Sequence, residues 1–139
     1  MSGVIVSVDR NSGMVATVKM GDQITVIDES GVETGADTGP TPMDYIMSAL
    51  GSCTVITLHM YAQRKNWPLE RAEVTLQQRT LSNTESALAA GDKRTLISKT
   101  LQLTGDLTPE QISRLKDISS RCPIQKTLEA GMVIQTTLI

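Results

Sequence analysis

The most constraining feature of this 139-residue sequence is a long helical pattern near its middle. Thr41 suits the N-cap, Pro42 suits the first helical position, and the carboxylate of Asp44 suits the exposed amides of the first turn. The segment Asn66-Trp67-Pro68 ends the pattern, because a residue before proline is disfavoured in a helical conformation. The sequence therefore predicts a central helix of about 24 residues.

Apolar and small side chains recur along this segment at spacings of three and four, as on one face of a helix. Cys53 lies on that stripe about three turns into the helix, so we expect its sulfur to face a core or an interface. Gly51 and Ser52 have little volume, which lets another element approach beside Cys53. The full stripe comprises Ile46, Ala49, Leu50, Cys53, Ile56, Thr57 and Met60.

Alternating patterns before the helix predict an antiparallel meander. Its strands are expected at Val4–Val8, Met14–Met20 and Gln23–Ile27, separated by turn signals. The segment Asp28–Gly39 is rich in glycine and acidic residues. It lacks the Lys-Ser/Thr pair of a phosphate-binding loop, so we interpret it as a mobile linker.

After the helix, the alternating segments Glu73–Thr80 and Thr95–Thr104 predict two antiparallel strands joined by a polar loop over residues 81–94. A capping box at Thr108 and Gln111 predicts a short helix, whose buried side is expected to carry Ile112, Leu115 and Ile118. Further elements are expected to be a helix that begins at Cys122-Pro123 and ends at Ala130, and a last strand at Met132–Leu138.

The predicted order of elements indicates an α+β fold in a single domain over residues 1–139. Residues 1–40 would form the meander and loop, 41–66 the central helix, and 67–139 the remaining strands and helices. One Trp and two Tyr, with no Phe, leave an aliphatic core, and we expect a neighbouring subunit to complete its burial.

Charge and hydropathy exclude several classes of partner. A net charge of −2 offers no basic field for nucleic acid or anionic lipid. The uninterrupted apolar runs are far shorter than a membrane-spanning helix, and the first residues lack a signal-peptide pattern, so we expect a cytoplasmic protein.

The two cysteines each allow a functional and a structural interpretation. They are too few for a disulfide-stapled scaffold, and with one His they cannot supply four zinc ligands. Cys122 lies at a helix N-terminus, where the dipole favours a thiolate and Arg121 is adjacent, although a small buried cysteine is also ordinary at such a position. For Cys53, an inert core thiol is the structural alternative.

Three other residues are weaker candidates. Asp44 precedes Cys53 by about 2.5 helical turns and so lies on roughly the opposite side, which favours a capping role. His59 points away from Cys53 by the same reasoning and is interpreted as structural. Arg10 lies in the turn after the first strand, as either a solvated surface residue or a functional cation presented by the sheet.

Three motifs together resemble the OsmC/Ohr family of organic hydroperoxide reductases, in its OsmC-like branch. They are Gly39-Pro40-Thr41-Pro42-Met43-Asp44-Tyr45, Ala49-Leu50-Gly51-Ser52-Cys53 and the distant Cys122-Pro123-Ile124. The resemblance covers nearly the whole chain. It implies an OsmC-like fold in which antiparallel sheets wrap around long central helices of an intertwined homodimer.

The resemblance also implies a thiol-dependent peroxidase that needs no metal, flavin or haem. Cys53 would be the peroxidatic residue, whose thiolate attacks an organic hydroperoxide and becomes a sulfenic acid. Cys122 would be the resolving residue that forms a disulfide with it. A dithiol, such as a dihydrolipoyl protein, would then reduce the disulfide.

Within the same resemblance, Arg10 matches a thiolate-stabilising Arg of the N-terminal sheet. The best-known members carry a Glu directly after the Pro that begins the helix, whereas this sequence has Met43 there and its carboxylate one place later, at Asp44. Some OsmC-like branches share this pattern. The alternative function is a noncatalytic OsmC-like dimer that binds a small apolar ligand at the subunit interface.

Overall fold

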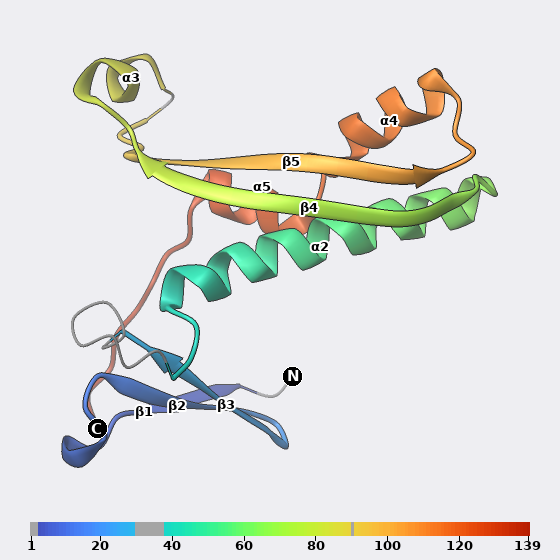
Figure 1. Cartoon of the computed structure of the whole chain (residues 1–139). Coiled ribbons are helices and arrows are strands. Elements are labelled where there is room, and N and C mark those ends of the chain that lie inside the picture. The colour runs from blue at the N-terminus through green and yellow to red at the C-terminus, as the bar shows by residue number, and fades with distance from the viewer. Residues whose placement is uncertain (1–2, 30–37, 90) are drawn as a thin grey trace. The chain divides into compact units, whose positions relative to one another are not determined.

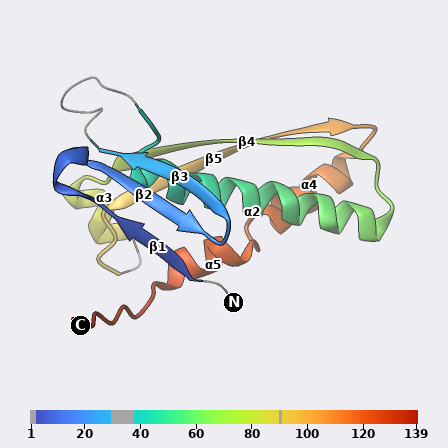
Figure 2. The same ribbon diagram turned by 90° about the horizontal axis from the view of Figure 1, so that it is seen from below.

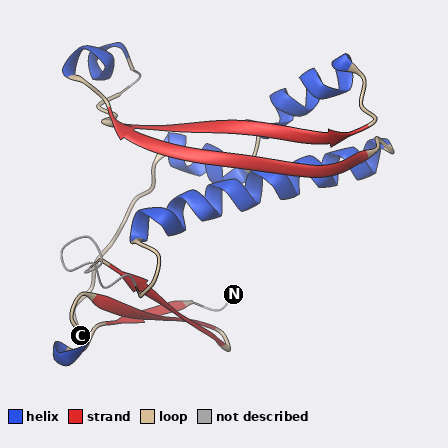
Figure 3. Cartoon of the chain, in the orientation of Figure 1, coloured by secondary structure: helices blue, strands red, loops and turns tan. Residues whose placement is uncertain are grey.

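A computed structural model describes residues 3–29, 38–89 and 91–139 of the chain. The chain forms two compact units, residues 1–48 and 49–139. Their helices, strands and loops are distinguished in Figure 3. The predicted single domain over residues 1–139 stays a prediction. Most of the linker predicted over residues 28–39 lies outside the described residues.

The first unit contains the predicted meander. Strands β1 (Val4–Ser7), β2 (Val15–Met20) and β3 (Gln23–Asp28) form an antiparallel sheet in the order β1-β2-β3 (Figure 1). A short 3-10 turn, Arg10–Ser12, separates the first two strands. Both the strands and their antiparallel pairing confirm what the alternating pattern predicted.

Polar side chains attach the chain before the long helix to the end of β3. The Asp28 amide donates to the Pro40 carbonyl at 2.9 Å. The buried Asp28 carboxylate accepts hydrogen bonds from the backbone amide and the hydroxyl of Thr38. The Tyr45 hydroxyl lies 2.7 Å from Thr25 Oγ1. These contacts position the start of the helix against its own sheet within the first unit.

Helix α2 (Pro42–Lys65) begins and ends where the sequence predicted. The Thr41 hydroxyl accepts from the Asp44 amide at 3.2 Å, and an Asp44 carboxylate oxygen accepts from the Thr41 amide at 3.0 Å, which completes a capping box. At the other end Asn66 takes a positive φ of 56°. Asn tolerates this left-handed conformation, which stops the helix before Pro68.

The buried face of α2 differs from the predicted stripe. Of that stripe only Leu50 is buried, whereas Ile46, Ile56 and Met60 are exposed. The helix is apolar on two sides, and the spacing alone does not show which side packs against the rest of the same chain. The residues that are buried are Leu50, Gly51, Thr54, Leu58 and Ala62.

In the second unit α2 runs along a long two-stranded ribbon, as Figures 1 and 2 both show. Strands β4 (Leu69–Thr80) and β5 (Thr95–Gly105) pair antiparallel and are longer than predicted. At Gly51 the backbone of α2 approaches this ribbon so closely that a Cβ would lie 2.8 Å from Leu76 Cδ1. The prediction that small residues admit a neighbouring element beside Cys53 is therefore confirmed.

The core of the second unit lies between α2, the ribbon and a short helix, α4 (Pro109–Ser119). Its buried centre is Leu58, Leu115 and Ile118, and the expected inward residue Ile112 is instead 45% exposed. The partly buried side chains around this centre are Tyr61, Trp67, Leu69, Ala72, Leu101, Leu103 and Leu107. At the end of the ribbon Gly105 has a φ of 143°, and a Cβ there would lie 2.1 Å from the Pro68 carbonyl oxygen.

The polar loop predicted over residues 81–94 contains a short helix, α3 (Asn83–Leu88). Its capping box joins Ser82 and Glu85, whose side chains each accept a hydrogen bond from the other's backbone amide at 3.1 Å. Arg79 also holds Glu85 through two hydrogen bonds, at 3.0 and 2.6 Å. These side-chain bonds provide hydrogen-bond partners for backbone amides at the start of α3. They explain why the prediction of a loop was wrong there.

Helices α4 and α5 (Pro123–Ala130) follow the predicted boundaries, and Gly131 ends α5 with a φ of 84°. The last predicted strand, 132–138, is wrong: residues 131–139 form no strand within the described part of the chain. Their apolar side chains are exposed, Val133 at 93% and Leu138 at 97%. A strand needs a neighbouring edge for its amides and carbonyls, and these residues pair with none in the described chain.

Candidate functional site

Cys53 lies in the second third of α2. It is half-buried, and its thiol is unbridged. The neighbouring Thr54 is fully buried, and its hydroxyl donates to the Leu50 carbonyl at 2.8 Å. The helix therefore presents a partly accessible thiol next to a buried hydroxyl.

Cys122 is the N-cap of α5. Its sulfur accepts a hydrogen bond from the Gln125 amide at 3.4 Å, in the place where a Ser or Asp oxygen would serve in other helices. Pro123 occupies the first helical position, where its missing N–H costs nothing. Cys122 is fully buried and unbridged. The local sequence thus places a thiol at the positive end of a helix.

The structure brings the two predicted cysteines together. Burial opposes the ionisation of Cys122, but a hydrogen bond with Cys53 and others from the Gln125 and Ile124 amides and from Thr54 outweigh it. The pKa of Cys122 is therefore lowered from its ordinary value. A low thiol pKa and a second thiol in contact are the two conditions for thiol–disulfide chemistry.

A lysine completes this cluster. The Lys99 ammonium donates to Thr54 Oγ1 at 3.1 Å and to the Ser119 carbonyl at 2.9 Å. Burial lowers the pKa of Lys99, whereas negative charge on Cys122, Cys53 and Glu129 favours its protonated form. Lys99 thus connects β5, α2 and the end of α4 beside both thiols.

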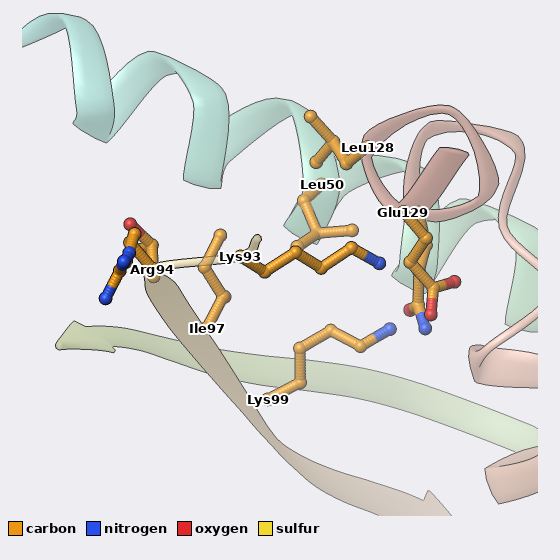
Figure 4. Close-up of a pocket in the computed structure, with 9 residues that line it drawn as sticks. Leu50, Lys93, Arg94, Ile97, Lys99, Leu128 and Glu129 are labelled. Carbon is orange, nitrogen blue, oxygen red and sulfur yellow. The ribbon is translucent and has the colours of Figure 1, made fainter. Parts of the chain in front are cut away.

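A cavity of about 550 Å³ lies next to Lys99, as Figure 4 shows. Lys93 and Lys99 both extend toward Glu129 in this view, and Leu50, Ile97 and Leu128 provide apolar wall. Gln125 also lines the cavity, and its side-chain oxygen is buried without a hydrogen-bond partner in the described residues. The remaining lining residues are Arg94 and Thr95. The cavity offers both apolar surface and polar groups to a small organic molecule.

Two of the other predicted site residues, Arg10 and Asp44, belong to the first unit. Arg10 is exposed in the 3-10 turn of the first unit, and Asp44 is occupied by the capping box at the start of α2. His59 is half-buried on α2. The structure therefore groups Cys53 with Cys122, while Arg10 and Asp44 belong to the unit that does not contain the thiols.

The sequence patterns did not identify Lys99 or Thr54 as site residues, although the sequence does contain a signal for Lys99. It occupies an inward position of β5, between Ile97 and Leu101 in the alternating pattern, where apolar residues are the rule. A charged residue at such a position indicates a buried polar partner. Thr54 has no comparable signal, because a threonine within a helix often bonds its own backbone.

Neither a metal centre nor a membrane span is found among residues 3–29, 38–89 and 91–139. No group of three or more His, Cys, Asp or Glu side chains there could hold a metal ion. In the same part of the chain, every helix is too short or too polar to cross a bilayer.

Solved structures share this fold at low sequence identity. An OsmC-like protein of Mycoplasma pneumoniae has a TM-score of 0.72 and 16% identity, covering 93% of this chain and 87% of its own. The organic hydroperoxide resistance protein OsmC of Legionella pneumophila has a TM-score of 0.62 and 15% identity, covering 91% and 87%. OhrB, the organic hydroperoxide resistance protein of Bacillus subtilis, has a TM-score of 0.61 and 18% identity, covering 91% and 88%.

No curated protein matches the sequence significantly. The family model of OsmC-like proteins matches residues 35–137, which is most of the chain. The α+β architecture, the antiparallel sheets and the neighbouring folds agree with that match. The chain therefore belongs to the OsmC-like protein family.

Proposed function

We propose that this chain is a thiol-dependent peroxidase that reduces organic hydroperoxides to alcohols. The observation that carries the proposal is that the Cys53 side chain lies close enough to Cys122 to favour its ionisation. A thiol that reacts with a peroxide becomes a sulfenic acid, and a second thiol in contact traps it as a disulfide before it oxidises further. The names of the structural neighbours from Legionella pneumophila and Bacillus subtilis support this substrate class.

In the proposed reaction Cys53 is peroxidatic, because it is the more accessible thiol. Its thiolate attacks one peroxide oxygen, the O–O bond breaks, and the alkoxide takes up a proton and leaves as the alcohol. Cys122 then attacks the sulfur of the Cys53 sulfenic acid. As the S–S bond forms, the S–O bond of the sulfenic acid breaks, and the departing hydroxide takes up a proton and leaves as water. A dithiol such as a dihydrolipoyl protein reduces the disulfide.

The cavity next to Lys99 supports an organic substrate. Leu50, Ile97 and Leu128 contribute apolar surface for the organic group of the hydroperoxide. Arg10 stays the proposed thiolate-stabilising guanidinium, and Asp44 a weaker carboxylate candidate, both through the resemblance to the family.

An intertwined homodimer is part of the proposal. Its support is the exposed second face of α2, where Ile46, Ile56 and Met60 recur at helical spacing. The exposed apolar residues of the 131–139 segment add a further surface that a second copy would cover. A cytoplasmic location belongs to the same proposal, because it would keep both thiols reduced between turnovers.

The first prediction tests the peroxidase directly. Purified protein with a dithiol reductant is expected to consume cumene hydroperoxide, and Cys53→Ser is expected to abolish turnover because no sulfenic acid can form. Cys122→Ser is the matched variant, which should react once and then stall. Unchanged turnover in Cys53→Ser would refute the assignment.

A mass measurement identifies the intermediate. After one equivalent of hydroperoxide, the intact protein should lose two hydrogens, and tryptic mapping should recover a peptide that links Cys53 to Cys122. An unchanged mass at both sulfurs would remove the main support for the mechanism.

The alternative, a noncatalytic dimer that binds a small apolar ligand, is favoured by the cavity alone. The two functions differ in their dependence on sulfur. A binder would retain an apolar fluorescent probe equally in native protein and in Cys53→Ser and would leave the hydroperoxide intact. A peroxidase would consume the hydroperoxide in the native protein only.

A further inference from the structure

Within the described residues, no carboxylate forms an ion pair with the half-buried Lys99. The ion pairs recorded in the described part of the chain join Arg71 to Glu73 and Arg79 to Glu85, at exposed positions. Lys99 instead donates hydrogen bonds to the neutral oxygens of Thr54 and Ser119. Placing an ammonium away from water is unfavourable unless an opposite charge balances it.

The groups that can supply this opposite charge are the two thiols. Charge on Cys122 and Cys53 acts on Lys99 more strongly than charge on Glu129, which is exposed on α5. Of the other elements around Lys99, β4 places the apolar Leu76 opposite it. The remaining charged groups that line the adjoining cavities are the cations Lys93, Arg94 and Lys116.

Thr54 interacts with both Lys99 and Cys122. Lys99 donates to Thr54 Oγ1, and the Thr54 hydroxyl has one proton for two acceptors, the Leu50 carbonyl and the Cys122 sulfur. A thiolate is the stronger acceptor because it is charged. Loss of the Cys122 proton would therefore turn the hydroxyl toward sulfur while Lys99 keeps its bond to the Thr54 oxygen.

We infer that Lys99 is the positioning cation of the thiol site, which acts through the Thr54 hydroxyl to hold Cys122 as a thiolate. The consequence for turnover rests on the proposed function: the Cys122 thiolate is the nucleophile that closes the disulfide with an oxidised Cys53. Lys99 touches neither the peroxide nor the reacting oxygen in this role. It sets the fraction of Cys122 that is ready to attack.

The decisive experiment titrates Cys122 without any peroxide. In a Cys53→Ser background, an isotope-labelled Cys122 Cβ is followed by NMR against pH. Lys99→Met is expected to raise the Cys122 titration midpoint by about one pH unit, which is about a tenfold loss of thiolate below the midpoint. Lys99→Arg, which keeps the charge, should stay near the parent. Lys126→Met, an exposed charge loss on the helix of Cys122, is the control and should leave the midpoint unchanged.

A second pair of variants tests whether Lys99 acts through the Thr54 hydroxyl or only stabilises the fold by its hydrogen bond to the Ser119 carbonyl. Thr54→Val removes the hydroxyl and leaves the Ser119 carbonyl available to Lys99, so it should raise the Cys122 midpoint as Lys99→Met does, and Thr54→Ser should restore it. Circular dichroism checks folding of each variant. If Lys99→Met does not fold, the Thr54 pair decides.

An unchanged midpoint in folded Lys99→Met or Thr54→Val would overturn the inference, whatever the turnover. A shifted midpoint in a protein that never consumes hydroperoxide would support the role of Lys99 in ionisation and overturn the peroxidase. The two failures are therefore distinguishable.

Discussion

Glu85 is the acid whose ionisation the structure favours most clearly. The Arg79 guanidinium, followed by the backbone amide and the hydroxyl of Ser82, lowers the pKa of Glu85 from its ordinary 4.5 to about 2. A folded-state pKa below the unfolded value means that the charged carboxylate stabilises the native protein. That stabilisation is present above pH 4.5 and is lost as the pH falls toward about 2.

We therefore expect Glu85→Gln to lower the midpoint of denaturant unfolding at neutral pH, because the amide cannot replace the charged bonds to Arg79. The difference from native protein should shrink as the pH falls from 4.5 to about 2. Glu110→Gln, in the first turn of α4, is the control at a site where no side-chain hydrogen bond to the acid is recorded in the described residues. A pH-independent effect of Glu85→Gln would contradict this account.

For individual residues, the sequence predicted only part of the candidate site. Cys53 and Cys122 stand out because cysteine is rare in this chain and each precedes or follows a distinctive local motif. Their contact depends on how α5 packs beside α2, which no local pattern encodes. Lys99 and Thr54 acquire their role from the same packing. A residue's chemistry can be inferred from sequence, whereas its partner comes from tertiary structure.

Among the elements, predictions succeeded where a few neighbouring residues determine the outcome. The capping residues Thr41 and Thr108, and Pro123 at the first position of α5, each set a helix start. Predictions failed where the outcome depends on which distant part of the chain an element packs against, as with the buried face of α2 and the last strand. Apolar residues on two sides of a helix satisfy the helical spacing equally well.

The end of the β4–β5 ribbon permits a test of element packing. Gly105→Ala combines a positive φ with a Cβ only 2.1 Å from the Pro68 carbonyl oxygen, so we expect a loss of about 3 kcal/mol or more in unfolding free energy. Gly91→Ala has a φ of 74° with open space around it and should lose about 1 kcal/mol. Chemical denaturation measures both. Equal losses would show that φ alone matters at Gly105.

On the scale of the whole molecule, large apolar side chains are exposed on several elements, including β1, α2 and the 131–139 segment. We expect Ile56→Asp, at a side chain that is 56% exposed on α2, to convert the proposed dimer to a monomer, because a buried charge at the interface would be unpaired. Light scattering after size-exclusion chromatography gives the mass. Leu88→Asp, at an 85% exposed position on α3, is the control. A native protein with monomer mass would contradict the dimer.

The contact between Cys53 and Cys122 has a further consequence for how the protein can be probed. Two neighbouring thiols can both bond to a single trivalent arsenic atom, whereas an isolated thiol holds such a reagent weakly. A phenylarsine label would therefore bind this pair more tightly than it binds a single thiol. Because the arsenical requires both sulfurs to be free, the label would also report the redox state of the site.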